Sequence, residues 1–143
     1  MSAAEKEIPS VKVTACMASA QPWVSCTDDI QAKVLSVDES RFSVEFLFKI
    51  AAGYRSGNHK HMCETSVLVL EGKVRNDTTG VEFGPGDFCY QPYNDTHDEH
   101  FVEETVVYAS YRGHQDKLVE FYDEQGEVCG EFLLSEFAAL LPQ

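Results

Sequence analysis

Two histidines separated by one residue, His59 and His61, are the strongest sign of chemistry in this 143-residue chain. On an extended strand, residues i and i+2 project from the same face, so the two imidazoles would point at one metal ion. Neutral imidazole is a good ligand for iron, zinc, copper and nickel. A third candidate ligand, His97, follows a glycine turn, a strand-like run and Pro92. The sequence therefore predicts a metal site built by these histidines.

Short runs of β-branched and aromatic residues must position these histidines, and turn residues separate the runs. Such regular spacing predicts an all-β sandwich or barrel. The runs cover 30–37, 42–50, 65–70, 73–75, 81–83, 88–91, 105–112, 118–122 and 127–132. Only the C-terminal end has a helical pattern. Ser135 is expected to cap a helix over 136–141, and Pro142 follows the last periodic residue. The number of strands alone leaves open an immunoglobulin-like sandwich, an up-and-down barrel and a jelly roll.

The composition restricts the partners. The chain has 11 Lys and Arg residues and 24 Asp and Glu residues, which gives a formal net charge of −13. Nucleic acids and anionic membranes both require a basic patch, so neither is expected as a partner. No apolar stretch reaches membrane-spanning length and the start lacks the layout of a signal peptide, which predicts a cytoplasmic protein. The five cysteines form no C-x-x-C pair, so we expect reduced thiols.

Two motifs identify a family resemblance. Gly53, followed after five residues by His59-Lys60-His61 and later by Gly72, resembles the first cupin motif; Gly86, Pro92, Asn94 and His97 resemble the second. The resemblance implies one cupin domain over 1–143, a double-stranded β-helix (jelly-roll) barrel with one short C-terminal helix. The implied parts are an N-terminal arm or strand over about 1–25, the barrel over about 26–112, and C-terminal strands and the helix over 113–143. It also implies that His59, His61 and His97 bind the metal.

The chain departs from the first motif where a glutamate ligand is expected. Thr65 and Ser66 occupy those positions, and Glu64 comes one residue too early, which on a strand points it to the opposite face. A β-bulge could re-aim Glu64 toward the metal. Cys63 shares the parity of His61 and could be a soft ligand, although a small buried thiol is the preferred reading. The expected ligand set is therefore three histidines without a carboxylate, with Glu64 and Cys63 left open.

A cupin site of three histidines resembles the small iron(II) dioxygenases that cleave acetylacetone and hydroxyacetophenones. The resemblance implies Fe(II) as cofactor, with Zn, Ni or Mn possible in the purified protein. The implied reaction is cleavage of a carbon–carbon bond in a β-dicarbonyl or hydroxyketone by O₂. Gln91 stands where many relatives carry Glu before the Pro of the second motif. Gln91, Phe101 and Tyr108 are the residues expected to line the substrate pocket or to support the metal ligands.

A second hypothesis gives the protein a non-catalytic role. The chain also resembles non-catalytic metal-binding cupins that act as sensors or small-molecule binding modules, such as the cupin part of certain zinc-dependent anti-sigma factors. A homodimer is the expected assembly, because cupins of this size often pair through their sheets. The remaining histidines have plainer readings: His100 is expected on a solvated edge and His114 in a surface turn.

Overall fold

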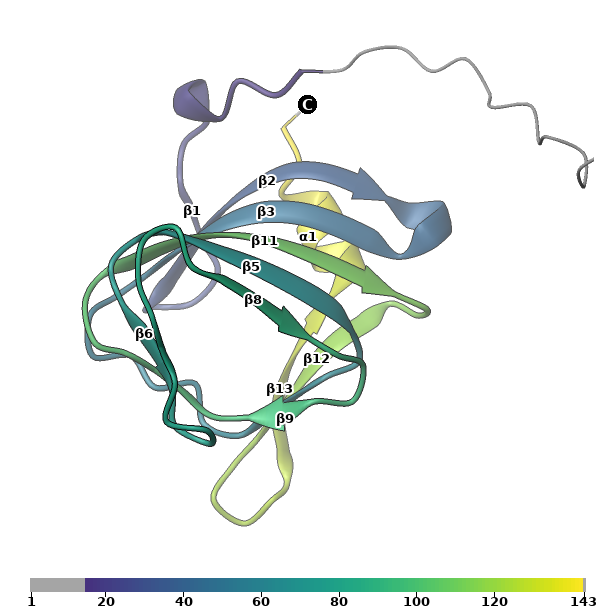
Figure 1. The fold of residues 1–143 in the computed structure, drawn as a ribbon. Coiled ribbons are helices and arrows are strands. Elements are labelled where there is room, and N and C mark those ends of the chain that lie inside the picture. Colours follow the sequence, from purple (N-terminus) through teal and green to yellow (C-terminus); the bar gives the residue numbers. More distant parts are fainter. Residues whose placement is uncertain (1–14, 143) are drawn as a thin grey trace, which may run out of the picture.

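A six-stranded antiparallel sheet forms one wall of the molecule in the computed structural model, which describes residues 15–142 (Figure 1). Every strand pairing in this sheet is antiparallel. In spatial order the strands are β1 (Val24–Ser25), β2 (Ile30–Asp38), β3 (Ser43–Ile50), β11 (Thr105–Gly113), β5 (Cys63–Glu71) and β8 (Phe88–Gln91).

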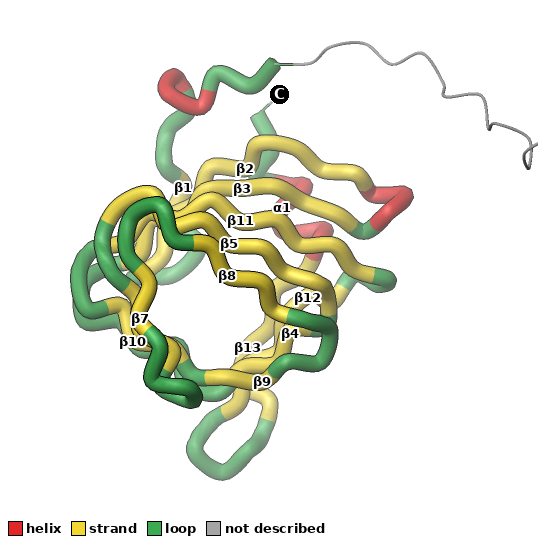
Figure 2. Tube along the Cα trace, in the orientation of Figure 1, coloured by secondary structure: helices red, strands yellow, loops and turns green. Residues whose placement is uncertain are grey.

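Two smaller antiparallel sheets close the barrel opposite this wall (Figure 2). The four-stranded sheet has the order β13 (Val128–Leu133), β12 (Lys117–Tyr122), β4 (His59–His61) and β9 (Thr96–His97). The three-stranded sheet has the order β10 (Glu99–Phe101), β6 (Val74–Asn76) and β7 (Glu82–Phe83). The predicted all-β jelly roll with one short C-terminal helix is therefore confirmed.

The core forms because apolar residues alternate along the central strands. On β3, Val44, Phe46 and Phe48 face inward and are buried, while the residues between them are more exposed. The ring of Phe46 packs edge-on against Tyr111 of β11, at 4.8 Å between centroids, and stacks on Phe137 at the same distance. Burying a large aromatic side chain contributes about 1.5–3 kcal/mol, so this cluster anchors the wall behind the histidines.

The C-terminal helix α1 (Leu134–Ala139) begins earlier than the sequence predicts. Leu133 precedes it and offers no side-chain cap, and Ser135 lies inside the first turn. The cap comes instead from the β11–β12 connection: Asp116 accepts hydrogen bonds from the backbone N–H and the hydroxyl of Ser135, at 2.9 and 3.0 Å. The prediction of Ser135 as N-cap is therefore wrong, because a distant carboxylate satisfies the free N–H groups.

The C-terminal segment contributes directly to the wall that carries the histidines. β12 pairs with β4, with Val119 opposite His61 and Phe121 opposite His59. The C-terminal strands expected over 113–143 therefore include one that lies beside the histidine strand. At the other end, part of the segment expected to be an arm or strand forms β1 against β2, whereas 1–14 lie outside the described residues. Within 15–142, no helix is both long and apolar enough to cross a membrane.

Candidate metal centre

Strand pairing brings the three predicted ligands together. His59 and His61 project from the same side of β4 and are buried, with Lys60 between them. β9 pairs with β4 so that His97 lies directly opposite His59. The ligating atoms of the three histidines all lie within 4.8 Å of one another. These three residues form a group that could hold a metal ion.

A hydrogen bond to Nδ1 orients each of the three rings. Nδ1 of His59 lies 3.0 Å from the carbonyl oxygen of Gly57, and Nδ1 of His97 lies 2.5 Å from a carboxylate oxygen of Asp95. A carbonyl or carboxylate oxygen can only accept, so both Nδ1 atoms carry the proton. His61 Nδ1 lies 2.9 Å from the Thr65 hydroxyl. Partners of this kind fix the ring and turn Nε2 toward a metal.

Two of the three Nε2 atoms make no hydrogen bond in the fold. Nε2 of His61 and Nε2 of His97 are buried and lack a hydrogen-bond partner. A buried polar atom without a partner costs about 1–3 kcal/mol, which a bound metal would offset. Two buried nitrogens therefore fit the metal that the motifs predict.

The pKa values of His61 and His97 are shifted in opposite directions. Burial and the neighbouring His59 and His97 lower the pKa of His61 to about 3, which keeps its ring neutral and able to bind metal. Burial also lowers the pKa of His97, but the carboxylates of Glu99 and Asp95 raise it by more, so its pKa is raised overall.

Glu99 is a residue of this site that the sequence reasoning missed. Its Oε1 lies 3.5 Å from Nε2 of His59 and 3.4 Å from Nε2 of His97. Burial raises the pKa of the Glu99 carboxyl, but the two imidazoles lower it by more, so it is ionised. The available signal was the spacing: His97 and Glu99 are two apart in an extended run and share a side. The acidic stretch around them had suggested a solvated edge.

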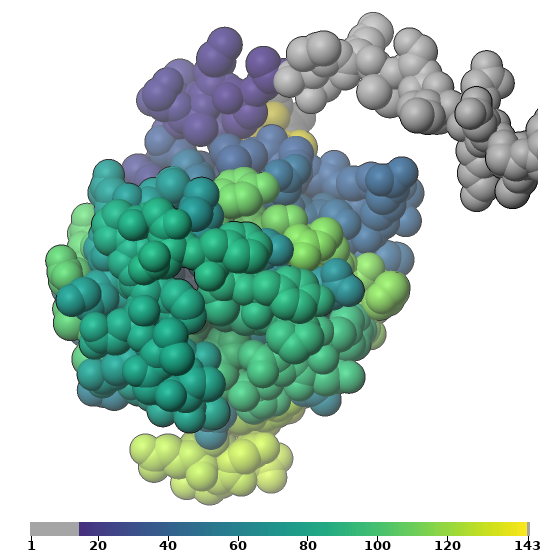
Figure 3. Space-filling model, viewed as in Figure 1, coloured from purple at the N-terminus to yellow at the C-terminus, as the bar shows by residue number. Residues whose placement is uncertain are grey.

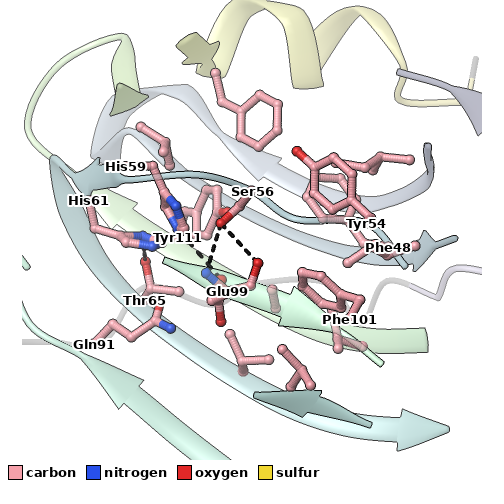
Figure 4. A pocket seen from close by; sticks show the side chains of 18 of the residues that line it. Phe48, Tyr54, Ser56, His59, His61, Thr65, Gln91, Glu99, Phe101 and Tyr111 are labelled. Atoms are coloured by element: carbon pink, nitrogen blue, oxygen red, sulfur yellow. Dashed lines mark hydrogen bonds and ion pairs between the residues drawn. The ribbon is translucent and has the colours of Figure 1, made fainter. Parts of the chain in front are cut away.

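A small cavity of about 80 Å³ opens beside the histidines. By this measure one water needs about 10–15 Å³, so the cavity could hold several waters or one small organic molecule. Residues of the middle of the chain cover most of this end of the barrel, with a narrow gap between them (Figure 3). The lining is polar at one end and aromatic at the other, as Figure 4 shows for His59, His61, Thr65, Gln91 and Glu99 on one side and Phe48, Tyr54 and Phe101 on the other.

Of the three expected pocket residues, the structure brings two to the cavity. Gln91 and Phe101 are buried and line it. Tyr108 does not: its hydroxyl donates to the Glu45 carboxylate on the outer face of the sheet. The expectation for Tyr108 is corrected by strand parity, since Val107 and Ala109 on either side of it face inward. The aromatic residue of β11 that lines the cavity is Tyr111.

The two open ligand candidates lie away from the histidine nitrogens. Glu64 is exposed and its carboxylate is 3.8 Å from Nε of Arg112, on the outside of β5. Cys63 is fully buried, and its Sγ is 3.5 Å from the Thr65 hydroxyl. Their contacts are with Arg112 and Thr65 and not with an Nε2 atom of the three histidines. The bulge that could have re-aimed Glu64 is not formed, because β5 pairs with β11 and β8 in regular register around it.

We expect Cys63 to resist alkylation in the folded protein. Burial raises the pKa of its thiol to about 11, and the thiolate is the reactive form. Iodoacetamide at pH 8 should label the exposed Cys129 fully while Cys63 stays unlabelled until the protein is denatured, as read by peptide mass spectrometry. Labelling of both thiols at equal rates would contradict this placement.

We expect Thr65→Val to weaken metal binding without unfolding the domain. Thr65 is fully buried and its hydroxyl partners Nδ1 of His61, and valine keeps the volume but removes the hydroxyl. Loss of such a supporting contact typically costs about 10–100-fold in metal affinity. Zinc affinity measured by competition with a chelator checks this, and an affinity equal to that of the wild type would show that the hydroxyl does not orient His61.

A jelly-roll barrel that gathers three histidines from paired strands defines a cupin. Residues 11–116 match the family described as the ChrR cupin-like domain, and the chain belongs to this family. No curated protein matches the chain.

Solved structures with the same fold come from several bacteria. An RmlC-like cupin from Ralstonia eutropha JMP134 has a TM-score of 0.77 at 17% identity, covering 89% of this chain and 83% of its own. Acetylacetone dioxygenase from Acinetobacter johnsonii has a TM-score of 0.73 at 15% identity, covering 98% and 97%. The anti-sigma factor ChrR from Rhodobacter sphaeroides, in complex with SigE, has 0.55 at 20%, covering 65% and 49%. At these identities the likeness shows the fold alone.

Proposed function

We propose that this protein is an Fe(II)-dependent dioxygenase that cleaves a carbon–carbon bond in a small β-dicarbonyl or hydroxyketone. The observation that carries the proposal is a set of three buried imidazoles in a small, mostly apolar cavity. In the described part of the chain, no Lys or Arg lines this cavity. A phosphate or carboxylate substrate would lack a partner on the walls, whereas a small carbonyl compound can bind through its own oxygen atoms to a metal.

The chain supplies orientation, hydrogen bonding and exclusion of water. Bound Fe(II) would supply a Lewis acid for the substrate oxygens and a redox centre for O₂. Thr65 and Asp95 hold the imidazoles in place. Oε1 of Gln91 is buried without a hydrogen-bond partner, so it can accept a hydrogen bond from a substrate hydroxyl. Phe101 and Tyr111 exclude water from the apolar part of the cavity. The fold shared with an acetylacetone dioxygenase supports this reading.

Oxygen uptake tests the proposal. Metal is first measured in protein purified without chelator and without a nickel column. The metal-free protein is then loaded with Fe(II) under anaerobic conditions and mixed with O₂ and either acetylacetone or a hydroxyacetophenone. We expect oxygen uptake that requires both iron and substrate. Protein loaded with zinc is the matched control and should consume no oxygen.

One observation favours a second candidate, a metal-binding sensor or binding module. The family that the chain belongs to is described by the cupin-like domain of ChrR, and the ChrR structure is an anti-sigma complex. Tightly held zinc, together with no oxygen uptake after iron loading, would contradict the dioxygenase and favour this module. Nickel or manganese in the purified protein, with oxygen uptake on that metal, would retain the reaction and correct the cofactor.

A further inference from the structure

We propose that Glu99 is the fourth protein ligand of the metal, a carboxylate that β10 supplies in place of the one missing from the first motif. Thr65 holds the position where that motif expects a glutamate, and its hydroxyl is already committed to His61. The inference rests on the metal centre of the proposed function but is independent of the reaction.

The distances fit a shared metal better than a hydrogen bond. Oε1 of Glu99 is 3.5 Å from Nε2 of His59 and 3.4 Å from Nε2 of His97. A hydrogen bond between N–H and O is usually about 2.7–3.2 Å. Two atoms that each bind one metal at about 2.1 Å in a tetrahedral arrangement lie about 3.4 Å apart. The carboxylate oxygen therefore stands where a ligand would stand relative to both nitrogens.

The hydrogen bonds at Nδ1 leave Nε2 of His59 and Nε2 of His97 facing the Glu99 carboxylate. Because Nδ1 of His59 donates to a carbonyl oxygen and Nδ1 of His97 to a carboxylate, each neutral ring carries a lone pair on Nε2. Both Nε2 atoms face a carboxylate oxygen of Glu99. Such a cluster of acceptors repels itself in a buried site unless a proton or metal lies among them. Nε2 of His61 is also buried without a hydrogen-bond partner, and the ligating atoms of the three histidines lie within 4.8 Å of one another, so one metal ion could serve all three rings.

The backbone holds Glu99 in place through the loop before β4. The hydroxyl of Ser56 accepts a hydrogen bond from the Glu99 N–H at 3.0 Å, and the Ser56 N–H donates to the Glu99 carbonyl at 2.9 Å. Ser56 lies three residues before His59, so one short segment fixes both ligands. Only 19% of the Glu99 side chain is exposed, so rotating it out to solvent would carry an energetic cost.

Binding of Glu99 would also set the charge of the site. A divalent metal with three neutral imidazoles and one carboxylate carries a net charge of +1. One enolate neutralises this charge in a cavity whose described lining holds no Lys or Arg. A β-dicarbonyl or hydroxyketone bound as its monoanion is therefore the substrate class that matches such a site.

Metal titrations of the full chain test the inference without substrate or oxygen. Metal-free wild type, Glu99→Gln and Glu103→Gln are titrated with Zn²⁺ against a competing chelator, and with Co²⁺ while the visible absorption is recorded. Glutamine keeps the shape of Glu99 but is a poor metal ligand. We expect Glu99→Gln to bind zinc at least about 100-fold more weakly, beyond the usual range for a supporting residue, with a changed Co²⁺ spectrum. Glu103→Gln, at an exposed position of the same acidic run, should match the wild type in both.

An unchanged zinc affinity or an unchanged Co²⁺ spectrum in Glu99→Gln would overturn the inference, because a residue that only supports a ligand leaves the donor set around cobalt as it was. If Glu99→Gln fails to fold, Glu99→Asp serves as the second variant. Its shorter carboxylate should shift the spectrum and weaken binding, and a wild-type spectrum would overturn the inference. Failure of oxygen uptake would overturn only the proposed reaction.

Discussion

His97→Ala is expected to abolish metal binding while leaving a folded domain. His97 is 1% exposed, comes from a strand that pairs with β4, and faces His59 directly. Loss of a supporting residue costs about 10–100-fold in affinity, so loss of a ligand should exceed this range. The measurements are metal content per chain after Fe(II) or Zn²⁺ loading and gel filtration, and oxygen uptake under the conditions proposed above.

The matched control is His100→Ala. His100 lies three residues further along, and its Nδ1 contacts Arg75 instead of the three histidines. This variant should keep its metal. Circular dichroism and thermal unfolding of both metal-free variants check the fold. If His97→Ala still retains one equivalent of iron, the three-histidine site is wrong.

The histidine cluster could be predicted because its geometry follows from local rules. The spacing of His59 and His61 fixes a shared face on any extended strand, and two motifs at fixed spacing place His97 beside them. Asn94 illustrates the same point: it takes a positive φ of 69°, in a position where the motif normally carries glycine. Such features depend on a few neighbouring residues, and the structure contains each of them.

Glu99 and Tyr108 could not be placed in the same way, because their positions depend on strands far away in sequence. On β11 both faces carry apolar or aromatic residues, so the sequence does not show whether Tyr108 or Tyr111 points inward. A shift of one residue exchanges the two faces. Pairing with β3 and β5 decides the matter. Glu99 sits in a run of acids that is typical of a solvated edge, and its hydrogen bonds to Ser56 hold it beside the histidines.

The fold itself was easier to predict than the element ends. Alternation along β3 predicts its inward face, and the turn-rich spacing predicts the many short antiparallel strands. The start of α1 was missed because its cap, Asp116, is 19 residues from Ser135. Long-range hydrogen bonds of this kind carry no local sequence signal.

Gly72→Ala is expected to destabilise the protein strongly although it lies outside the metal site. Gly72 ends the first motif, at the turn between β5 and β6, and adopts a φ of +89°. A Cβ there would lie 2.3 Å from the carbonyl oxygen of Glu104 and 2.7 Å from Cα of Thr105. These are backbone atoms at the start of β11, so they cannot move without disturbing the central strand. We expect a loss of about 3–5 kcal/mol, or a fall in Tm of about 10–20 °C.

Gly80→Ala separates this steric effect from backbone strain. Gly80 has a similar φ of +79°, but nothing lies within 4 Å of a Cβ there, so only the left-handed conformation is penalised, by about 1–2 kcal/mol. Equal losses in the two variants would show that β11 yields at Gly72. A larger loss at Gly72 would mean that this motif position is constrained by the close packing of the turn on Thr105. The motif then combines two requirements, because its histidines supply chemistry while its final glycine lets the β5–β6 turn lie against the strand behind them.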